Sequence, residues 1–245
     1  MAQSVRIGTA GWTIPSAVSP DFPGEGGHLS RYSRRFDVAE INSSFHRPHR
    51  PATYARWAET VPPDFRFCAK VSRNITHERR LVDAVEPFEG FLAEVAPLGT
   101  RLGPLLIQLP PSLAFDLSVA DAFFGMARGR FAGPVALEPR HARWFAEPAD
   151  GLLRAHGISR VAADPARAES ADAPGGSPSL VYMRLHGSPR VYFSSYEEPY
   201  LEALAGRLRR HAETGAEVWW IFDNTAHGAA APNALALLKM MSASA

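Results

Sequence analysis

Eight short runs rich in β-branched and aromatic residues recur along the 245-residue chain, and this alternation constrains the fold more than any other feature. Most gaps between the runs carry apolar residues at helical spacing, as in Phe88, Phe91 and Val95. Strands that alternate with helices are typical of parallel βαβ units. The predicted strands are residues 5–12, 37–45, 65–72, 103–110, 135–141, 159–164, 180–187 and 217–225.

Eight such units in a chain of this length predict a single (β/α)8 TIM-type barrel domain over residues 1–245. An open doubly wound sheet is the main competitor, but the first strand–helix junction, "GTAGWTIP", lacks the spacing of a dinucleotide-binding loop. The sixth unit differs from the others because residues 165–179, "PARAESADAPGGSPS", are rich in Pro, Gly and Ala. We therefore expect a loop there and a barrel that is irregular around the sixth unit.

The ends of two helices are also predicted from the sequence. Ser118 is expected to cap the helix that contains Val119 and Met126, because serine side chains accept hydrogen bonds from the first backbone amides of a helix. The last helix, marked by Leu235 and Leu238, is expected to begin after Asn233.

Composition and charge exclude several protein classes. The formal net charge is +1, which implies no general attraction to nucleic acid or to an anionic membrane. No window approaches the roughly 18 uninterrupted apolar residues of a membrane span, and the first residues lack the pattern of a signal peptide. The single cysteine, Cys68, has apolar neighbours and is expected to be a small core residue. These features predict a cytoplasmic protein.

Charged residues interrupt the apolar run "VALEPRH" at residues 135–141. Strand residues two apart share a face, so Ala136, Glu138 and Arg140 point one way, whereas Val135 and Leu137 point the other. In a barrel the second set would face the surrounding helices. The first set would line the interior and rise toward the carboxyl end of the strand, where a charge can reach water and ligand.

The same pattern recurs at the ends of most predicted strands, which predicts a ring of polar side chains around one cavity. Active sites of TIM-type barrels lie at this end of the barrel. At the end of the eighth strand, alternation alone leaves open whether Asp223 or Asn224 faces inward. The polar residues at the strand ends are Glu40, Asn42, Lys70, Gln108, Glu138, Arg140, Asp164, Arg184, His186, Asp223 and Asn224.

Six motifs along the chain resemble the YecE-like family, also called domain of unknown function 72. They occur in the expected order between Gly8 and Leu237. The resemblance implies a TIM-type barrel with its polar motifs gathered at one mouth, and it implies no particular reaction. The motifs are "EINSSFHRP", "FRFCAKVSRNITH", "QLPPS", "EPRHARW", "MRLHG" and "WIFDNTAHGAAAPNALAL".

The residues themselves favour an enzyme that uses metal-free acid/base or hydrolytic chemistry on an anionic or phosphorylated small molecule. Glu138 and Glu40 are the predicted acid/base pair, and His186 and Asp223 are predicted catalytic partners. The predicted substrate-binding residues are Lys70, Arg140 and Arg184, which would bind the anion, together with Asn42, His77, Gln108, Asp164 and Asn224. No metal and no cofactor are predicted.

Two other function classes remain open at this stage. The first is a metal-dependent phosphodiesterase or sugar-isomerase-like barrel, with ligands drawn from Glu40, Glu138, Asp164, His186 and Asp223. The second is a non-catalytic protein that binds nucleic acid or a nucleotide through "RYSRRF", "HRPHRP" and "HERR", which the near-neutral net charge disfavours. Trp12, Trp144, Tyr192 and Tyr196 are aromatic residues that could stack on a base or sugar.

A purely structural interpretation also accounts for the charges at the strand ends. In that interpretation Glu138–Arg140 and Lys70–Glu40 are neutralising ion pairs that fill the barrel mouth.

Overall fold

A computed structural model describes residues 5–242, and its strands form one sheet. Neighbouring strands follow the order β7-β9-β10-β1-β2-β3-β4-β5-β6-β8. All paired strands run parallel except β6 and β8. The strands are β1 (Val5–Ala10), β2 (Val38–Ile41), β3 (Arg66–Lys70), β4 (Leu102–Gln108), β5 (Val135–Glu138), β6 (Ser159–Arg160), β7 (Ala162–Asp164), β8 (Gly175–Gly176), β9 (Leu180–Leu185) and β10 (Glu217–Phe222).

The two ends of the sheet meet at the sixth predicted strand, which is interrupted at Val161. Its first half, β6, pairs with β5, and its second half, β7, pairs with β9. Counting β6 and β7 as one barrel strand gives the eight parallel positions that the sequence predicts. The TIM-type barrel is therefore confirmed, and the two-residue β8 is an added antiparallel strand beside β6.

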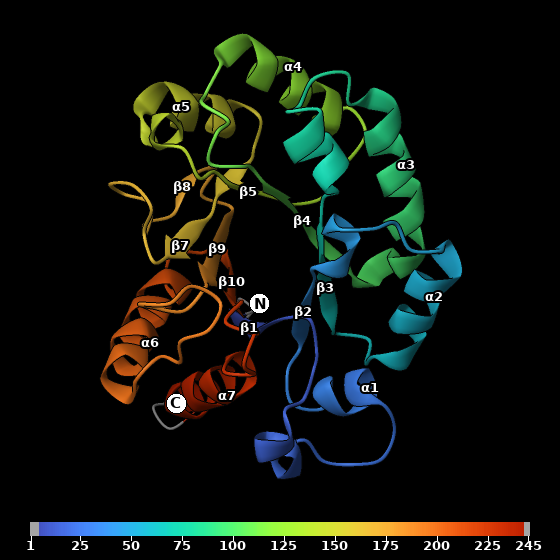
Figure 1. Ribbon diagram of the computed structural model, residues 1–245, viewed down its shortest axis with the longest axis vertical. Helices are drawn as coiled ribbons and strands as arrows, with labels where there is room; N and C mark the ends of the chain where they lie inside the picture. The colour runs from blue at the N-terminus through green and yellow to red at the C-terminus, as the bar shows by residue number, and fades with distance from the viewer. Residues whose placement is uncertain (1–4, 243–245) are drawn as a thin grey trace.

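Helices α2 to α7 lie around the outside of the strands (Figure 1). The sixth unit holds turns and β8 in place of a helix, which confirms the predicted irregularity. The helices are α1 (His28–Tyr32), α2 (Pro51–Thr60), α3 (Val85–Val95), α4 (Leu117–Arg128), α5 (Glu147–Ala155), α6 (Glu198–Ala212) and α7 (Ala230–Ser242). No helix within residues 5–242 is both long enough and apolar enough to cross a membrane.

Two predicted helix ends are wrong. Asp116, not Ser118, caps α4, because its carboxylate accepts the backbone amide of Val119 at 3.1 Å. Helix α7 begins at Ala230, so Asn233 lies inside it. The buried Asn233 side chain instead accepts the backbone amide of Tyr196 at 3.0 Å, which fixes the loop that precedes α6.

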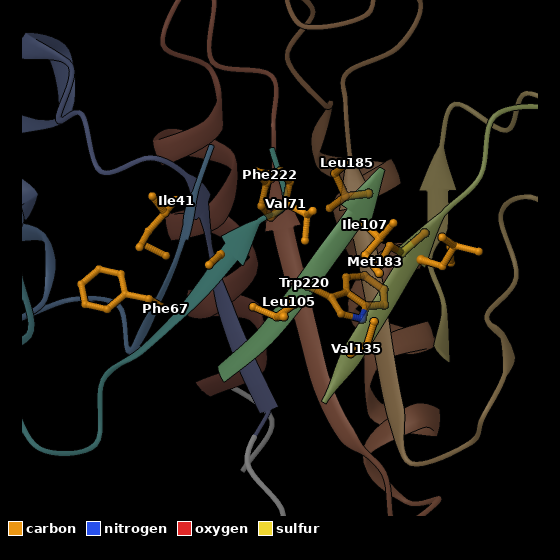
Figure 2. Close-up of a cluster of buried hydrophobic side chains, with 14 of the residues drawn as sticks. Ile41, Phe67, Val71, Leu105, Ile107, Val135, Met183, Leu185, Trp220 and Phe222 are labelled. Atoms are coloured by element: carbon orange, nitrogen blue, oxygen red, sulfur yellow. The ribbon is translucent and has the colours of Figure 1, made fainter. Parts of the chain in front are cut away.

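Alternation along the strands produces two separate apolar layers. Side chains such as Phe67, Leu105 and Trp220 point outward and pack beneath the helices, and Figure 2 shows part of this cluster. Residues one position away, such as Cys68 and Trp219, fill the barrel interior. The predicted core position of Cys68 is confirmed, and burial raises the pKa of its thiol well above 9.0.

Most strands end earlier than the sequence predicts. Strand β5 stops at Glu138, so Arg140 and His141 belong to the following loop. Pro139 lacks a backbone N–H and cannot continue the ladder of hydrogen bonds. Consequently the last inward-facing strand residue, Glu138, is buried within the barrel, whereas Arg140 lies higher and is partly exposed.

Candidate functional site

Ionisable side chains from five barrel strands or the residues just after them meet at the carboxyl end of the barrel. The first ionisable residue on each strand lies two positions after a residue of the apolar interior layer. Lys70 thus follows Cys68, and Arg184 follows Tyr182. All are less than 9% exposed. The set comprises Glu40 after Ala39 in β2, Lys70 in β3, Glu138 in β5, Arg184 and His186 at the end of β9, and Asp223 after β10.

The guanidinium of Arg184 lies at the centre of this set and has no exposed surface. It donates to both carboxylate oxygens of Glu40, at 2.7 and 3.0 Å. It also donates to Glu138 at 2.6 Å and to Asp223 at 2.9 Å. One arginine therefore bridges three carboxylates that arrive from three different strands, and we call these four residues the Arg184 cluster.

His186 joins two members of the Arg184 cluster. Its Nδ1 lies 2.9 Å from Asp223 Oδ2, and its Nε2 lies 2.9 Å from Glu138 Oε1. Both ring nitrogens need a proton to donate to carboxylates, which is the imidazolium form. Burial disfavours this charge, but Glu138 and the two hydrogen bonds outweigh it and raise the pKa of His186 above 6.5. The two carboxylate partners therefore favour the protonated form of His186, and its predicted catalytic role stays a prediction.

The carboxylates of the cluster are held ionised by their surroundings. Burial alone would raise the pKa of Glu138, but Arg184, His186 and Arg140 outweigh it and hold this pKa well below 4.5. Burial likewise opposes ionisation of Asp223, and Arg184 together with the hydrogen bond from His186 lowers the pKa of Asp223 below 3.8.

A cavity of about 510 Å³ lies above the cluster. Six of the predicted site residues line it: Asn42, Lys70, His77, Gln108, Arg140 and Asp223. Phe45, His46, Arg73, Tyr192 and Thr225 complete its wall. A volume of this size suits a small molecule.

Glu40, Glu138 and Arg184 do not line this cavity, and their predicted roles in acid/base chemistry and anion binding stay predictions. Each is at most 2% exposed, and all lie within the ion-pair network beneath the cavity. The predicted acid/base pair and the predicted anion-binding Arg184 therefore neutralise one another. The structural interpretation of the charges predicted a Lys70–Glu40 pair, but Glu40 pairs with Arg184 instead.

Lys70 lies at the cavity wall and is only 5% exposed. Its ammonium donates to Asn42 Oδ1 at 3.0 Å and lies 4.2 Å from the centre of the Phe45 ring. Within residues 5–242 no carboxylate lies within 4.0 Å of it, because the nearby acids are bonded to Arg184 and His186. Burial, together with the positive charge of Arg184, lowers the pKa of Lys70 to about 8.

Arg140 and Tyr192 form the opposite part of the cavity wall. Arg140 Nη2 donates to the Tyr192 hydroxyl at 3.1 Å and to Glu138 at 3.4 Å. Tyr192 has a φ of 71°, which is unusual for a residue with a side chain, and its ring packs edge-on against His186. Strained backbone of this kind concentrates at functional sites. The Tyr192 hydroxyl accepts from Arg140, so its own proton remains available to a ligand.

His77 reaches the cavity from the loop after β3. It lies in a single π-helical turn, η3 (Asn74–Glu78), and its Nδ1 lies 2.9 Å from Thr76 Oγ1. Burial lowers its pKa below 6.5, and the charges of Lys70 and Arg140 lower it further. His77 is therefore a neutral imidazole at pH 7, with Nε2 left for a ligand.

Two predicted substrate-binding residues lie outside the cavity. Asp164 points outward from β7, where its carboxylate accepts the hydroxyls of Tyr196, at 2.7 Å, and Tyr200. Asn224 donates to the Ser194 carbonyl at 2.9 Å and packs beneath the loop before α6. Alternation continues unbroken through Val161, which faces the interior, so Ala162 and Asp164 face the helices. At the end of β10, Asp223 faces inward.

We expect Asp164→Asn to leave anion binding in the cavity unchanged and to lower the free energy of unfolding by about 1–3 kcal/mol. The substitution removes one of the two carboxylate oxygens that accept the tyrosine hydroxyls, and it touches no cavity residue. Urea unfolding and phosphate titration on the same preparation measure both effects. Weakened phosphate binding would show that Asp164 contributes to the anion-binding site.

Sequence reasoning missed the cavity residues that loops contribute. Phe45, His46, Arg73 and Thr225 lie just after strands, so proximity to a strand end was the available signal. Of the four aromatic residues considered for stacking, Tyr192 alone lines this cavity. Trp144 is buried, with its indole N–H bonded to the Leu113 carbonyl at 2.9 Å.

The ligand set considered for a metal is divided in the structure. Asp164 lies on the outer face of the barrel, and the carboxylates of the other candidates are bonded to Arg184 or His186. In the part of the chain from Val5 to Ser242, no group of three or more His, Cys, Asp or Glu side chains is arranged to hold a metal ion.

Comparisons with known proteins give consistent matches. The family model described as "Protein of unknown function DUF72" matches residues 6–245. The UPF0759 protein YecE of Escherichia coli strain K12 is 28% identical over 166 residues, which cover 65% of this chain and 59% of that protein. The chain therefore aligns with less than two thirds of the length of this relative.

Solved structures of two family proteins share the fold. One, from Enterococcus faecalis, has a TM-score of 0.82 and 22% identity, with 98% of this chain and 96% of that chain covered. The other, from Thermotoga maritima, has a TM-score of 0.80 and 26% identity, with 97% and 99% covered. The irregular barrel described above is thus similar to the fold of both proteins.

Proposed function

This chain belongs to the DUF72 family, a family of unknown function, and we infer its chemistry from the residues that line its own cavity. We propose that it is an enzyme that performs acid/base chemistry on a small anionic substrate at the carboxyl end of the barrel. The observation that supports this proposal is that negative and positive side chains occupy different parts of the site. Carboxylates are neutralised beneath the cavity, while Lys70 and Arg140 line its wall.

A charge count of the buried site supports an anionic ligand. Three carboxylates, from Glu40, Glu138 and Asp223, oppose four cations, from Arg184, His186, Arg140 and Lys70. The sum of minus three and plus four is one positive charge, carried by the floor and wall of the cavity. An anion that enters the cavity would compensate it, and Arg140 offers the fork of N–H groups that carboxylates and phosphates prefer.

Two side chains at the cavity are suited to moving protons, and a third can accept a hydrogen bond from a substrate. Lys70, with a pKa of about 8, can exchange a proton near neutral pH. Tyr192 can donate its hydroxyl proton to a developing oxyanion, since the hydroxyl oxygen already accepts from Arg140. Asp223 uses Oδ2 to bind Arg184 and His186, so its Oδ1 is the oxygen available to a substrate. We assign Glu40 and Glu138 the task of holding Arg184 and His186 in place.

The two other function classes have less support. In a metal-dependent phosphodiesterase or isomerase, the ligating carboxylates would first have to leave Arg184 and His186. Binding of nucleic acid would require a broad basic surface, which the net charge of +1 does not suggest.

The proposal predicts that inorganic phosphate binds the protein and that Arg140→Met weakens this binding at least about tenfold, equivalent to about 1.4 kcal/mol. Calorimetric titration at pH 7 and constant ionic strength measures both affinities. Arg154→Met is the matched control, because Arg154 lies on α5, is half exposed and pairs with Glu147. If both variants bind phosphate as the unmodified protein does, or if none binds it, the anion site is not in this cavity.

A further inference from the structure

Lys70 is a nearly buried amine without a carboxylate partner among residues 5–242, although three carboxylates are close enough to influence its charge. A buried ammonium normally forms an ion pair, because an unpaired buried charge is costly. The Arg184 cluster removes that option, since Arg184 and His186 occupy the acids. The ammonium form of Lys70 has only an amide oxygen and an aromatic face as partners.

The use of lysine at this position is itself informative. Lys70 and Lys239 are the only lysines among the 26 basic residues, and all the others are arginine. Arginine would supply a permanent cation and a better anion-binding group. Lysine differs in that it can lose its proton and become a nucleophile, and burial beside another cation favours that form.

We propose that Lys70 acts as an amine nucleophile that forms an imine with the carbonyl carbon of an anionic aldehyde or ketone. The inference rests on the proposed function, because Arg140 is expected to hold the anionic group of the same substrate. It narrows the substrate class from small anions to those that carry a carbonyl group, such as phosphorylated aldehydes and oxo acids.

The covalent step balances with groups already at the cavity. The lone pair of neutral Nζ attacks the carbonyl carbon, so a C–N bond forms and the C=O π bond breaks. The carbonyl oxygen takes a proton from Tyr192, which regains one from solvent, and Nζ passes one of its two hydrogens as a proton to His77, which gives a neutral carbinolamine. Its hydroxyl then leaves with a second proton as water while the C=N bond forms, and Nζ keeps one hydrogen as an iminium. Tyr192 is placed to supply a proton to the oxygen, and His77 to relay one.

The surroundings of Nζ suit the iminium product. Asn42 Oδ1, at 3.0 Å, can accept its remaining N–H, and the face of the Phe45 ring can stabilise its positive charge. The charged groups that face Nζ from the adjoining strands are Arg184, Glu40, Asp223 and Glu138, and the three acids favour a cation there. The amine can therefore attack a carbonyl carbon on the cavity side while its own partners remain in place.

Reductive trapping with two aldehyde probes tests this proposal. The protein is incubated at pH 7 with pyridoxal 5′-phosphate or with pyridoxal, which lacks the phosphate, then treated with sodium borohydride, and the modified peptides are identified by mass spectrometry. Lys239 on α7 is exposed and serves as the internal control. About one tenth of an amine with a pKa near 8 is unprotonated at pH 7, against roughly one in 2,500 for an ordinary lysine.

We expect pyridoxal 5′-phosphate to modify Lys70 at least about tenfold faster than Lys239, after allowance for the lower nucleophilicity of a less basic amine. Lys70→Arg should abolish this fast reaction. Lys239→Arg should leave the fast reaction unchanged. Pyridoxal should react with Lys70 more slowly than its phosphate ester does.

The outcomes separate the two proposals. If phosphate binds and Arg140→Met weakens it, but Lys70 is modified no faster than Lys239, the imine proposal is wrong and the anion site stands. If both aldehydes modify Lys70 equally fast and phosphate does not compete, the nucleophile stands and the anion site is wrong. Circular dichroism of each variant excludes unfolding as the cause of a lost reaction.

Discussion

Replacing Arg184 by methionine is expected to lower the free energy of unfolding by about 3–5 kcal/mol, because it leaves buried carboxylates without their shared cation. Four hydrogen bonds from Arg184 to Glu40, Glu138 and Asp223, at 2.6–3.0 Å, disappear together. Methionine fills similar space, so the expected loss is electrostatic and not a cavity effect. Urea unfolding at pH 7 measures the difference.

Two further variants test whether the loss comes from unpaired acids and from the missing guanidinium group. Arg184→Met combined with Glu40→Met removes one of the three stranded acids, and we expect it to be more stable than the single variant. Arg184→Lys keeps the charge but lacks the fork that bridges three carboxylates, so its stability should lie between those of the unmodified protein and Arg184→Met. A cost below about 1 kcal/mol for Arg184→Met would show that the cluster does not depend on this cation.

The stabilisation that Glu138, Asp223 and His186 contribute is expected to fall on both sides of a maximum near pH 5–6. On the acid side, Glu138 and Asp223 have pKa values below their usual 4.5 and 3.8. Their stabilisation is present above those values and is lost as the pH falls toward the folded-state pKa. On the alkaline side, the pKa of His186 is raised above 6.5, so its stabilisation is full below 6.5 and is lost as the pH rises through the raised value.

Each group whose pKa is shifted changes the free energy of unfolding by at most about 1.4 kcal/mol per pH unit within its window. The lowered pKa of Lys70 makes its contribution to the free energy of unfolding increase as the pH rises from about 8 to 10.5. The loss of stability caused by His186 is therefore clearest between pH 6.5 and 8.

Urea unfolding of His186→Gln and Glu138→Gln across this pH range tests the acid limb and the alkaline limb of the profile separately. The acid limb is the range in which stability is lost as the pH falls, and the alkaline limb is the range in which it is lost as the pH rises. His186→Gln should flatten the alkaline limb between pH 6.5 and 8 and leave much of the acid limb. Glu138→Gln should reduce the acid limb, and it should also weaken the alkaline limb because Glu138 is a main cause of the raised pKa of His186. Parallel curves for His186→Gln and the unmodified protein would mean that His186 is not a buried cation.

Buried charge in this site holds functional groups in position, as the geometry of Asp223 illustrates. Its Oδ2 is fixed by Arg184 and His186, each at 2.9 Å, which leaves Oδ1 in a defined direction at the cavity. A catalytic or binding group held by a rigid network needs little reorganisation when substrate enters. The cluster therefore explains why charges costly to bury occur on otherwise apolar strands.

The sequence was sufficient for the strands, the barrel and the existence of a polar mouth. Alternation of polar and apolar residues is a local property, and it placed Lys70, Arg184 and Glu138 on the inward face without knowledge of their neighbours. Position at a strand end alone adds Asp164 to this set, whereas alternation counted from the interior residue Val161 places Asp164 on the outer face. Alternation could not decide between Asp223 and Asn224, because the count of residues beyond a strand end does not fix the path of the chain.

Only the tertiary structure decided which inward residues are catalytic candidates and which form the cavity floor. Arg184 and Glu40 are 144 positions apart, so their bidentate pairing depends on how the barrel closes. That pairing consumes the acids, leaves Lys70 without one among residues 5–242, and turns a predicted anion-binding lysine into a proposed nucleophile. Local periodicity specifies the face on which a charge lies, whereas its partner, its exposure and hence its protonation depend on contacts between strands distant in the sequence.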